Sequence, residues 1–182
     1  MATVRLAESG YKKLSRSSSS GTIVDYRDHL SSNYLTQLMN KLKTSTVLNQ
    51  TEGLFIDFNR KTFGDQATEI YEEFGDAIKN KDKLELMKLC SFSMHEVVLA
   101  HLKDPKIPLG FQILENPISS TIRQARIFSL DTHNMNTAVT WHQILVRFEF
   151  ESSKGGKVFK HNVFERREDE QEQRLWRIAH IE

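Results

Sequence analysis

The stretch from Ala138 to Phe150 limits most strongly how this chain can fold, because apolar and polar side chains alternate along its second half. The apolar members stand at every second position: Ile144, Val146, Phe148 and Phe150. Successive side chains of a β-strand point to opposite faces, so this spacing predicts a half-buried antiparallel strand.

The rest of the C-terminal half also has the composition of strands separated by turns. The run 131–136 is rich in turn-forming residues, and Gly155 with Gly156 supplies the positive dihedral angles of a hairpin. We therefore expect further strands at Leu109–Leu114, Thr121–Leu130, Val158–Arg167 and Arg174–Ile181.

The half before Pro105 and Pro108 is helical in pattern, and these prolines end it. Asp65 is a candidate N-cap for a helix whose apolar residues share one face: Ala67, Ile70, Tyr71, Phe74, Ala77 and Ile78. Gly75 within it suggests close approach by another element. Two capping boxes, Asp82 with Glu85 and Ser93 with Glu96, predict short helices at about Lys83–Cys90 and Met94–Lys103.

Three helices followed by four or five antiparallel strands predict an α+β fold, with the helices on one face of a curved sheet. We expect this compact domain to span residues 63–182. Residues 44–62 are predicted to be a linker, pinned to a surface by the apolar run Leu54–Phe58. Residues 1–43 are predicted to form a basic arm and an amphipathic helix.

The expected N-terminal helix runs from Tyr26 to about Leu42, with apolar residues at three- and four-residue steps. Two interpretations stay open, because the apolar face could pack on the chain's own domain or dock on a partner. Under the second one, Leu35 and Leu38 are interface candidates.

Charge is distributed unevenly along the chain. Residues 1–43 carry seven Lys or Arg and three Asp or Glu, whereas residues 44–182 carry eighteen and twenty-one. The folded body, at a net charge of −3, lacks the basic excess of a nucleic-acid-binding domain. The arm is therefore the candidate for contact with RNA phosphates, through Arg5, Lys12, Lys13 and Arg16.

The arm also bears on compartment. Its start is rich in Arg and Ser and poor in acids, which suits mitochondrial targeting. No run of about 18 apolar residues exists, so we expect any membrane contact to be peripheral.

Residues capable of catalysis or metal binding do not form a recognised pattern. His95 and His101 are six positions apart, which does not match the four-residue step of paired helical ligands. His142 shares a strand face with Ile144, and we interpret it as a core histidine. An acid/base pair with Asp131 or Glu165 is the alternative. We predict no catalytic residue, metal or cofactor.

The single cysteine, Cys90, excludes an internal disulfide and is expected to be buried and inert. The two tryptophans are expected to differ. Trp141 lies opposite Ile144 in the alternation and is a candidate interface anchor. The predicted core contains Phe74, Phe148, Phe164 and Trp176. The charged run Glu165–Arg174 is interpreted as a solvated hairpin tip, with protein docking as the alternative.

The chain end carries a resemblance. Val163-Phe164-Glu165-Arg166, an acidic loop and Trp176-Arg177-Ile178 resemble the translocase subunit 44-like C-terminal domain family. Its members include the membrane-anchoring subunit of the mitochondrial import motor and mitochondrial large-ribosomal-subunit protein 45. The resemblance covers about 63–182 and implies a nuclear transport factor 2-like cone. It also implies a non-catalytic docking role in the mitochondrial matrix, peripheral to the inner membrane.

Within this family, Val163-Phe164-Glu165-Arg166 and the basic arm ahead of the domain are more similar to the ribosomal member than to the import-motor subunit. That similarity implies ribosomal RNA and mitochondrial ribosomal proteins as partners, near the exit tunnel, and no small-molecule substrate. Three alternatives remain: an accessory subunit of a respiratory or ATP-synthase complex, an import-motor anchor, and a small cone-fold enzyme.

Overall fold

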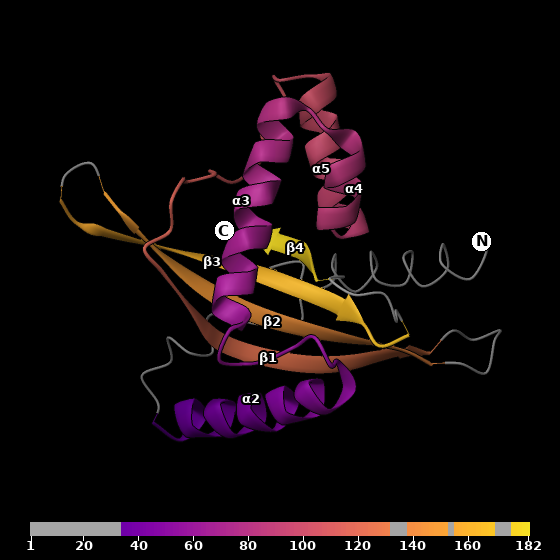
Figure 1. Ribbon diagram of the computed structural model, residues 1–182, viewed down its shortest axis with the longest axis vertical. Helices are drawn as coiled ribbons and strands as arrows, with labels where there is room; N and C mark the ends of the chain where they lie inside the picture. Colours follow the sequence, from indigo (N-terminus) through magenta and orange to yellow (C-terminus); the bar gives the residue numbers. More distant parts are fainter. Residues whose placement is uncertain (1–33, 132–137, 153–154, 170–175) are drawn as a thin grey trace.

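The computed structural model describes residues 34–131, 138–152, 155–169 and 176–182. Within them, helices precede an open antiparallel sheet whose strands follow the order β1-β2-β3-β4 (Figure 1). The predicted α+β class is thereby confirmed. The elements are α2 (Tyr34–Leu54), α3 (Phe63–Asn80), α4 (Lys83–Leu89), α5 (Phe92–Lys103), β1 (Ser119–Asp131), β2 (Ala138–Glu151), β3 (Lys157–Arg167) and β4 (Arg177–Ile181).

Helix α3 forms where its apolar periodicity predicts it. Its buried positions include Phe63, Ala67, Tyr71 and Phe74, which are three or four residues apart and face the sheet. The N-cap assignment to Asp65 is wrong, because Thr62 occupies that position. Asp65 lies in the first helical turn instead, where its negative charge is favourable at the positive end of the helix dipole.

For the short helices α4 and α5, the predicted N-cap residue is correct for α4 and two positions too late for α5. Asp82 caps α4 as predicted, its side chain accepting hydrogen bonds from two backbone amides of the first turn. The cap of α5 is Ser91 rather than Ser93, and its hydroxyl accepts from the amide of Met94. The reason is tertiary: the Ser91 amide donates to the carbonyl of Ile178, so the chain turns from a strand-like contact directly into the helix.

Helix α2 extends beyond the predicted position, so residues 44–54 are helical rather than part of a linker. The buried residues of this helix are Thr44, Leu48 and Thr51, one face of the added turns. Their contacts with the sheet outweigh a composition with little helical preference. Of the apolar run after it, Phe55 and Phe58 are buried, whereas Ile56 is fully exposed. Residues 26–33 of the predicted helix lie outside the described residues.

The sheet confirms the alternation that the sequence indicates. Ile144, Val146, Phe148 and Phe150 are at most 2% exposed and belong to one core cluster. Phe74, Phe164 and Trp176 lie in the same cluster. Trp176 is surrounded by aromatic rings, with the Phe63 centroid 4.9 Å and the Phe58 centroid 5.5 Å from its own.

The segment Leu109–Leu114 is not a strand, contrary to the prediction. Gly110 adopts a positive φ of 78°, and the amide of Leu114 donates to the Tyr71 hydroxyl at 2.9 Å. A side chain of α3 therefore binds an amide of this segment. The segment packs Phe111 and Ile113 against the core as an irregular loop.

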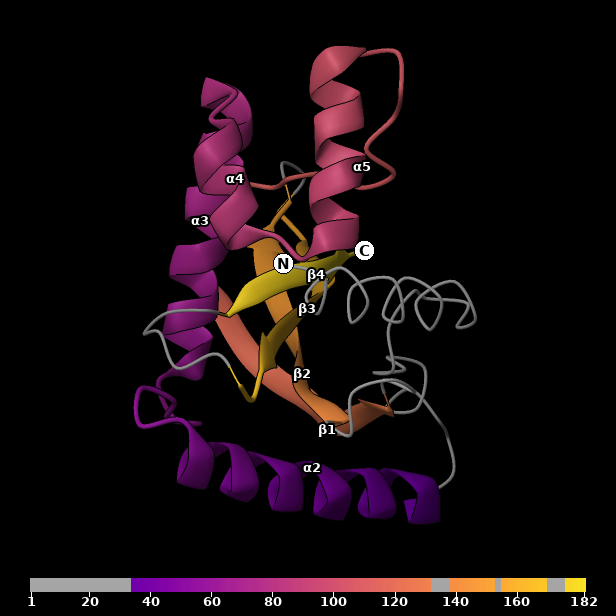
Figure 2. The same cartoon turned by 90° about the vertical axis from the view of Figure 1, so that its right-hand side faces the viewer.

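The free edge of β1 is covered by α2. Figure 2 shows α2 alongside β1, at the end of the sheet away from β4. The amide of Ala125 on β1 donates to the Thr44 hydroxyl across this junction, at 3.4 Å. Covering an edge strand with a helix protects its unpaired backbone groups from pairing with another chain.

Candidate docking surface on helix α2

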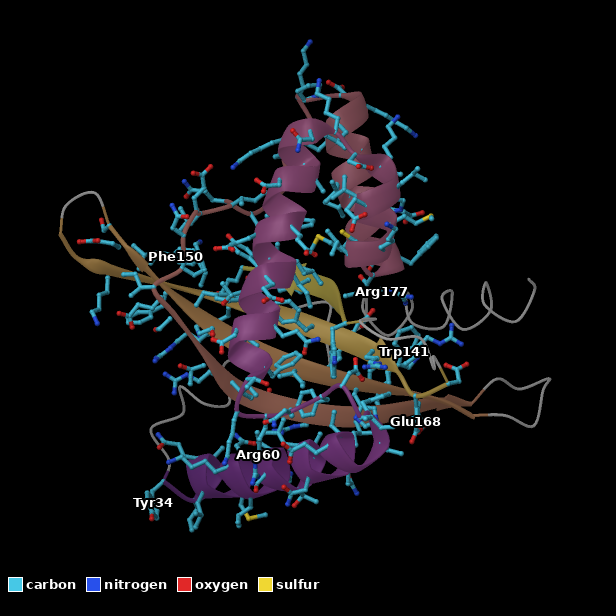
Figure 3. The ribbon with its side chains drawn as sticks, viewed as in Figure 1. Tyr34, Arg60, Trp141, Phe150, Glu168 and Arg177 are labelled. Carbon is cyan, nitrogen blue, oxygen red and sulfur yellow. The ribbon has the colours of Figure 1, made fainter. Side chains whose placement is uncertain are left out.

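Helix α2 exposes large apolar side chains on its outer face. The set, which we call the α2 stripe, comprises Tyr34, Leu35, Leu38, Met39 and Leu42, with exposed fractions from 39% to 74%. Their spacing places them together on one side of the helix. Figure 3 shows Tyr34 at the outer end of α2. A contiguous apolar patch of this kind is a mark of a protein-binding surface.

The opposite face of the same helical turns is polar and contacts β1. The amide oxygen of Asn40 accepts a 2.8 Å hydrogen bond from the Arg126 guanidinium. The hydroxyl of Thr44 lies 3.4 Å from the same guanidinium. The first half of α2 is therefore attached to the sheet edge by polar contacts, while its apolar residues point outward. This arrangement is the reverse of a helix that packs its apolar face on its own domain.

The second half of α2 is anchored through a histidine in the sheet. The Thr51 hydroxyl donates to the Val47 carbonyl at 2.8 Å and lies 2.9 Å from Nδ1 of His142. Because its one hydrogen is used on the carbonyl, the hydroxyl accepts from Nδ1–H, which fixes the tautomer of the imidazole. Burial lowers the pKa of His142, so the ring is neutral near pH 7.

The loop after α2 is fixed by a buried arginine. Both oxygens of Asp57 accept from the guanidinium of Arg166 on β3, at 2.7 and 2.8 Å. The same guanidinium lies over the Phe55 ring, 4.1 Å from its centroid, and the Arg166 side chain is only 3% exposed. An ion pair and a cation–π contact thus hold the loop against the strand.

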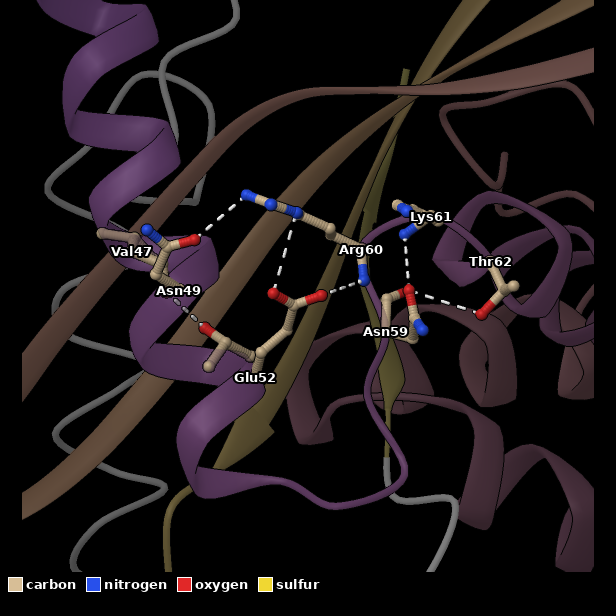
Figure 4. Close-up of polar contacts among 8 residues, drawn as sticks. Val47, Asn49, Glu52, Asn59, Arg60, Lys61 and Thr62 are labelled. Atoms are coloured by element: carbon tan, nitrogen blue, oxygen red, sulfur yellow. Dashed lines mark hydrogen bonds and ion pairs between the residues drawn. The ribbon is translucent and has the colours of Figure 1, made fainter.

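The outer side of this loop is tied back to α2, as Figure 4 shows. The amide of Arg60 donates to a Glu52 carboxylate oxygen at 2.9 Å, and its guanidinium donates to Asn49 at 3.0 Å. Together with the His142 and Arg166 contacts, these bonds hold α2 in a fixed position. A surface held this way loses less conformational entropy when a partner binds.

The predicted interface residues meet different outcomes. Leu35 and Leu38 lie on the α2 stripe. Trp141 is only 3% exposed, so its assignment as an exposed interface anchor is wrong. It points away from the core face, as the alternation indicates. Its cross-strand neighbours cover it, with Phe128 stacked at 6.3 Å and the Arg167 guanidinium 5.3 Å from the ring centroid.

The predicted RNA-contact residues, Arg5, Lys12, Lys13 and Arg16, lie outside the described residues. Sequence reasoning missed the anchors Thr51, Asp57 and Arg166. The available signal was the three- and four-residue spacing of Thr44, Leu48 and Thr51, which continues a helical face through a polar segment.

The alternative acid/base pairing of His142 with Glu165 is not formed. Glu165 stands opposite Gln143 and accepts a 3.1 Å hydrogen bond from it, whereas His142 stands opposite Arg166. The two side chains therefore point to different faces of the sheet. The side chain of Asp131 lies outside the described residues.

Other chemistry has little support in the described ranges. Burial raises the pKa of the Cys90 thiol to about 12, which keeps it protonated. Within residues 34–131, 138–152, 155–169 and 176–182, no three His, Cys, Asp or Glu side chains gather as metal ligands. None of the helices in that part of the chain has the length and hydropathy needed to cross a membrane.

No family model and no curated protein matches this sequence.

Proposed function

We propose that this chain is a non-catalytic docking subunit of the large subunit of the mitochondrial ribosome, near the exit tunnel and the inner membrane. The observation that carries the docking role is the α2 stripe, a row of apolar side chains exposed on a helix that is fixed to its own domain by polar contacts. The ribosomal setting comes from the resemblance of the chain end and from the basic arm.

The partner on the stripe is a ribosomal protein that offers an apolar groove with an acidic rim. Burying one exposed leucine side chain contributes about 1.5–3 kcal/mol, so a few stripe residues suffice for a stable contact. Lys41 and Lys43 flank the stripe. The sole acidic residue of α2, Glu52, lies near the C-terminal end of the helix, away from the stripe. This charge distribution favours an acidic partner surface.

The finer fold assignment belongs to the same proposal. We infer a nuclear transport factor 2-like cone, with α3, α4 and α5 packed against the antiparallel sheet and the arm outside it. Supporting this inference are the order of helices before strands and the contacts of α4 and α5 with β4, which lies at the far edge from α2 (Figure 2).

The test is sedimentation of the tagged full chain from mitochondrial lysate, with identification of the particle and its RNA. The wild-type chain should co-sediment with the large ribosomal subunit, and Leu35→Asp with Leu42→Asp should release it. Gln50→Asp is the control for each of the two substitutions tested singly, because it adds one negative charge, as each of them does, at an exposed position of the same helix outside the stripe.

Two results would overturn the proposal. Co-migration with a respiratory or ATP-synthase complex would replace the ribosome by that assembly. A wild-type chain that runs free of any large particle would remove the docking role. Circular dichroism of the variants shows whether lost sedimentation reflects lost binding rather than unfolding.

A further inference from the structure

A cavity of about 420 Å³ lies between α2 and β1, on the side of α2 that faces the sheet. Three cationic side chains line it: Lys41 from α2, Arg60 from the following loop and Arg123 from β1. They come from three separate segments of the chain. No carboxylate is among the described residues that line this cavity.

Arg123 occupies a bulge in β1. Its neighbours Ile122 and Gln124 pair with consecutive residues of β2, so Arg123 is the extra residue without an opposite partner. A bulge bends the strand and redirects the side chain of the inserted residue, and such bulges are common beside binding sites. Arg123 is among the residues that line the cavity.

The charge of Arg123 is poorly compensated. Its Nε atom is buried and has no hydrogen-bond partner in the described part of the chain. Burial and the nearby charge of Arg147 lower the pKa of Arg123, which reflects a cation in unfavourable surroundings. An anion in the cavity would supply the missing partner.

The other two cations are also available to a ligand. Lys41 forms no ion pair with any residue of the described ranges and is exposed at the cavity mouth. The Arg60 guanidinium donates to Asn49 through Nη1 at 3.0 Å and lies 3.7 Å from Glu52 through Nε, which leaves Nη2 to bind an anion. Arginine and lysine in this combination suit a phosphate group, with guanidinium hydrogen bonds and a point charge.

The remaining lining indicates more than a bare ion site. Gln37 and Ser45 add hydrogen-bonding groups, and Leu48 with Ile122 forms an apolar wall. The volume falls within the range of small-molecule sites and exceeds that of one phosphate. We propose that this cavity binds a small phosphorylated molecule, with its phosphate between Lys41, Arg60 and Arg123 and its organic part against the apolar wall.

This inference departs from the expectation of no small-molecule ligand and does not depend on ribosomal docking. It is tested on the full chain by calorimetric titration with inorganic phosphate and with glycerol phosphate, each against chloride at matched ionic strength. Saturable one-site binding is expected, tighter for the monoester. Arg123→Gln and Lys41→Gln should each weaken binding about tenfold or more, because each substitution removes a charge-assisted hydrogen bond to the phosphate.

Matched controls separate a built site from general charge attraction. Lys43→Gln and Lys61→Gln remove equal charge from neighbouring exposed positions outside the lining and should change affinity less than about twofold. Equal losses in the control variants would overturn the proposal, as would the absence of saturable binding.

Two further measurements cover a variant that fails to fold and a nucleic-acid ligand. If Arg123→Gln fails to fold, Lys41→Gln decides, because Lys41 is exposed and its substitution leaves the core untouched. A single-stranded RNA oligomer is titrated in parallel. Binding of the oligomer with no binding of either small phosphate would overturn the small-molecule assignment, whereas binding of both small phosphates supports it.

Discussion

The hydroxyl of Thr51 lies 2.9 Å from Nδ1 of His142, which joins the end of α2 to the middle of the sheet across 91 positions of sequence. The contact is buried, and Phe55 packs beside it, with 5.0 Å between the Phe55 and His142 ring centroids and an angle of 76° between the ring planes. This junction fixes the direction of α2 and, with it, the outward orientation of the α2 stripe.

Replacing Thr51 by Val should destabilise the protein. The substitution keeps the shape of the side chain but leaves the buried Nδ1–H of His142 without its acceptor, which costs about 1–3 kcal/mol. Chemical denaturation of the full chain measures the loss. Thr46→Val is the control, because the Thr46 hydroxyl bonds only to its own helix at an exposed position. Equal losses in the two variants would contradict the role of the Thr51–His142 bond.

The free energy of unfolding should fall as the solution becomes acidic. Burial lowers the pKa of His142 below its ordinary value of 6.5, so the unfolded chain binds a proton that the native chain rejects. The stability from this group is complete above about pH 6.5 and declines as pH falls toward the lowered pKa. His142→Gln should flatten the slope of stability against pH below about 6.5.

Part of that slope should remain in the variant. His161 and His180 also have pKa values lowered by burial, and they titrate in the same direction. An unchanged slope in His142→Gln would show that His142 is not protonated on unfolding in this range. Denaturation curves at a series of pH values provide the measurement.

Both tryptophans should now behave as structural residues. Trp176 is 1% exposed and Trp141 is 3% exposed. Truncating a buried aromatic side chain to Ala costs about 3–5 kcal/mol, so Trp176→Ala and Trp141→Ala should each lower the melting temperature strongly. Thermal melts check this. A Trp141→Ala variant with wild-type stability and weakened sedimentation would restore the interface role that its burial contradicts.

The strands, and the core face of α3, could be predicted because they depend on local periodicity. Alternation in β2 places Ile144 and Phe148 inward without any knowledge of what they contact. The same alternation places Trp141 on the other face, yet it cannot show whether that face is covered. Coverage depends on Phe128 and Arg167, which only the strand register brings next to Trp141.

The position of α2 could not be predicted for a related reason. Its last turns carry polar residues, and Thr44 and Thr51 find their partners on β1 and β2, more than 80 positions away. Neither the bulge at Arg123 nor the cavity beside it leaves a mark in the local pattern. The bulge is a mismatch between two strands, and the cavity needs α2 in place.

Among the glycines in the described ranges, Gly64 approaches another element most closely, rather than Gly75, where the sequence suggested close approach. A Cβ atom added at Gly75 would meet Ile113 at 3.5 Å, an ordinary contact, whereas one at Gly64 would meet the Ser120 hydroxyl at 2.5 Å. Gly64→Ala should therefore lower the melting temperature despite the higher helix propensity of Ala.

A second substitution separates this crowding from propensity. In a Ser120→Ala background the clashing hydroxyl is absent, and the nearest remaining atoms would lie at 3.4 and 3.6 Å. Gly64→Ala should there be neutral or stabilising by up to about 1 kcal/mol, the propensity difference between the two residues. The four melts form a double-mutant cycle. An equal cost of Gly64→Ala in both backgrounds would mean that Ser120 does not limit the approach of α3 to β1.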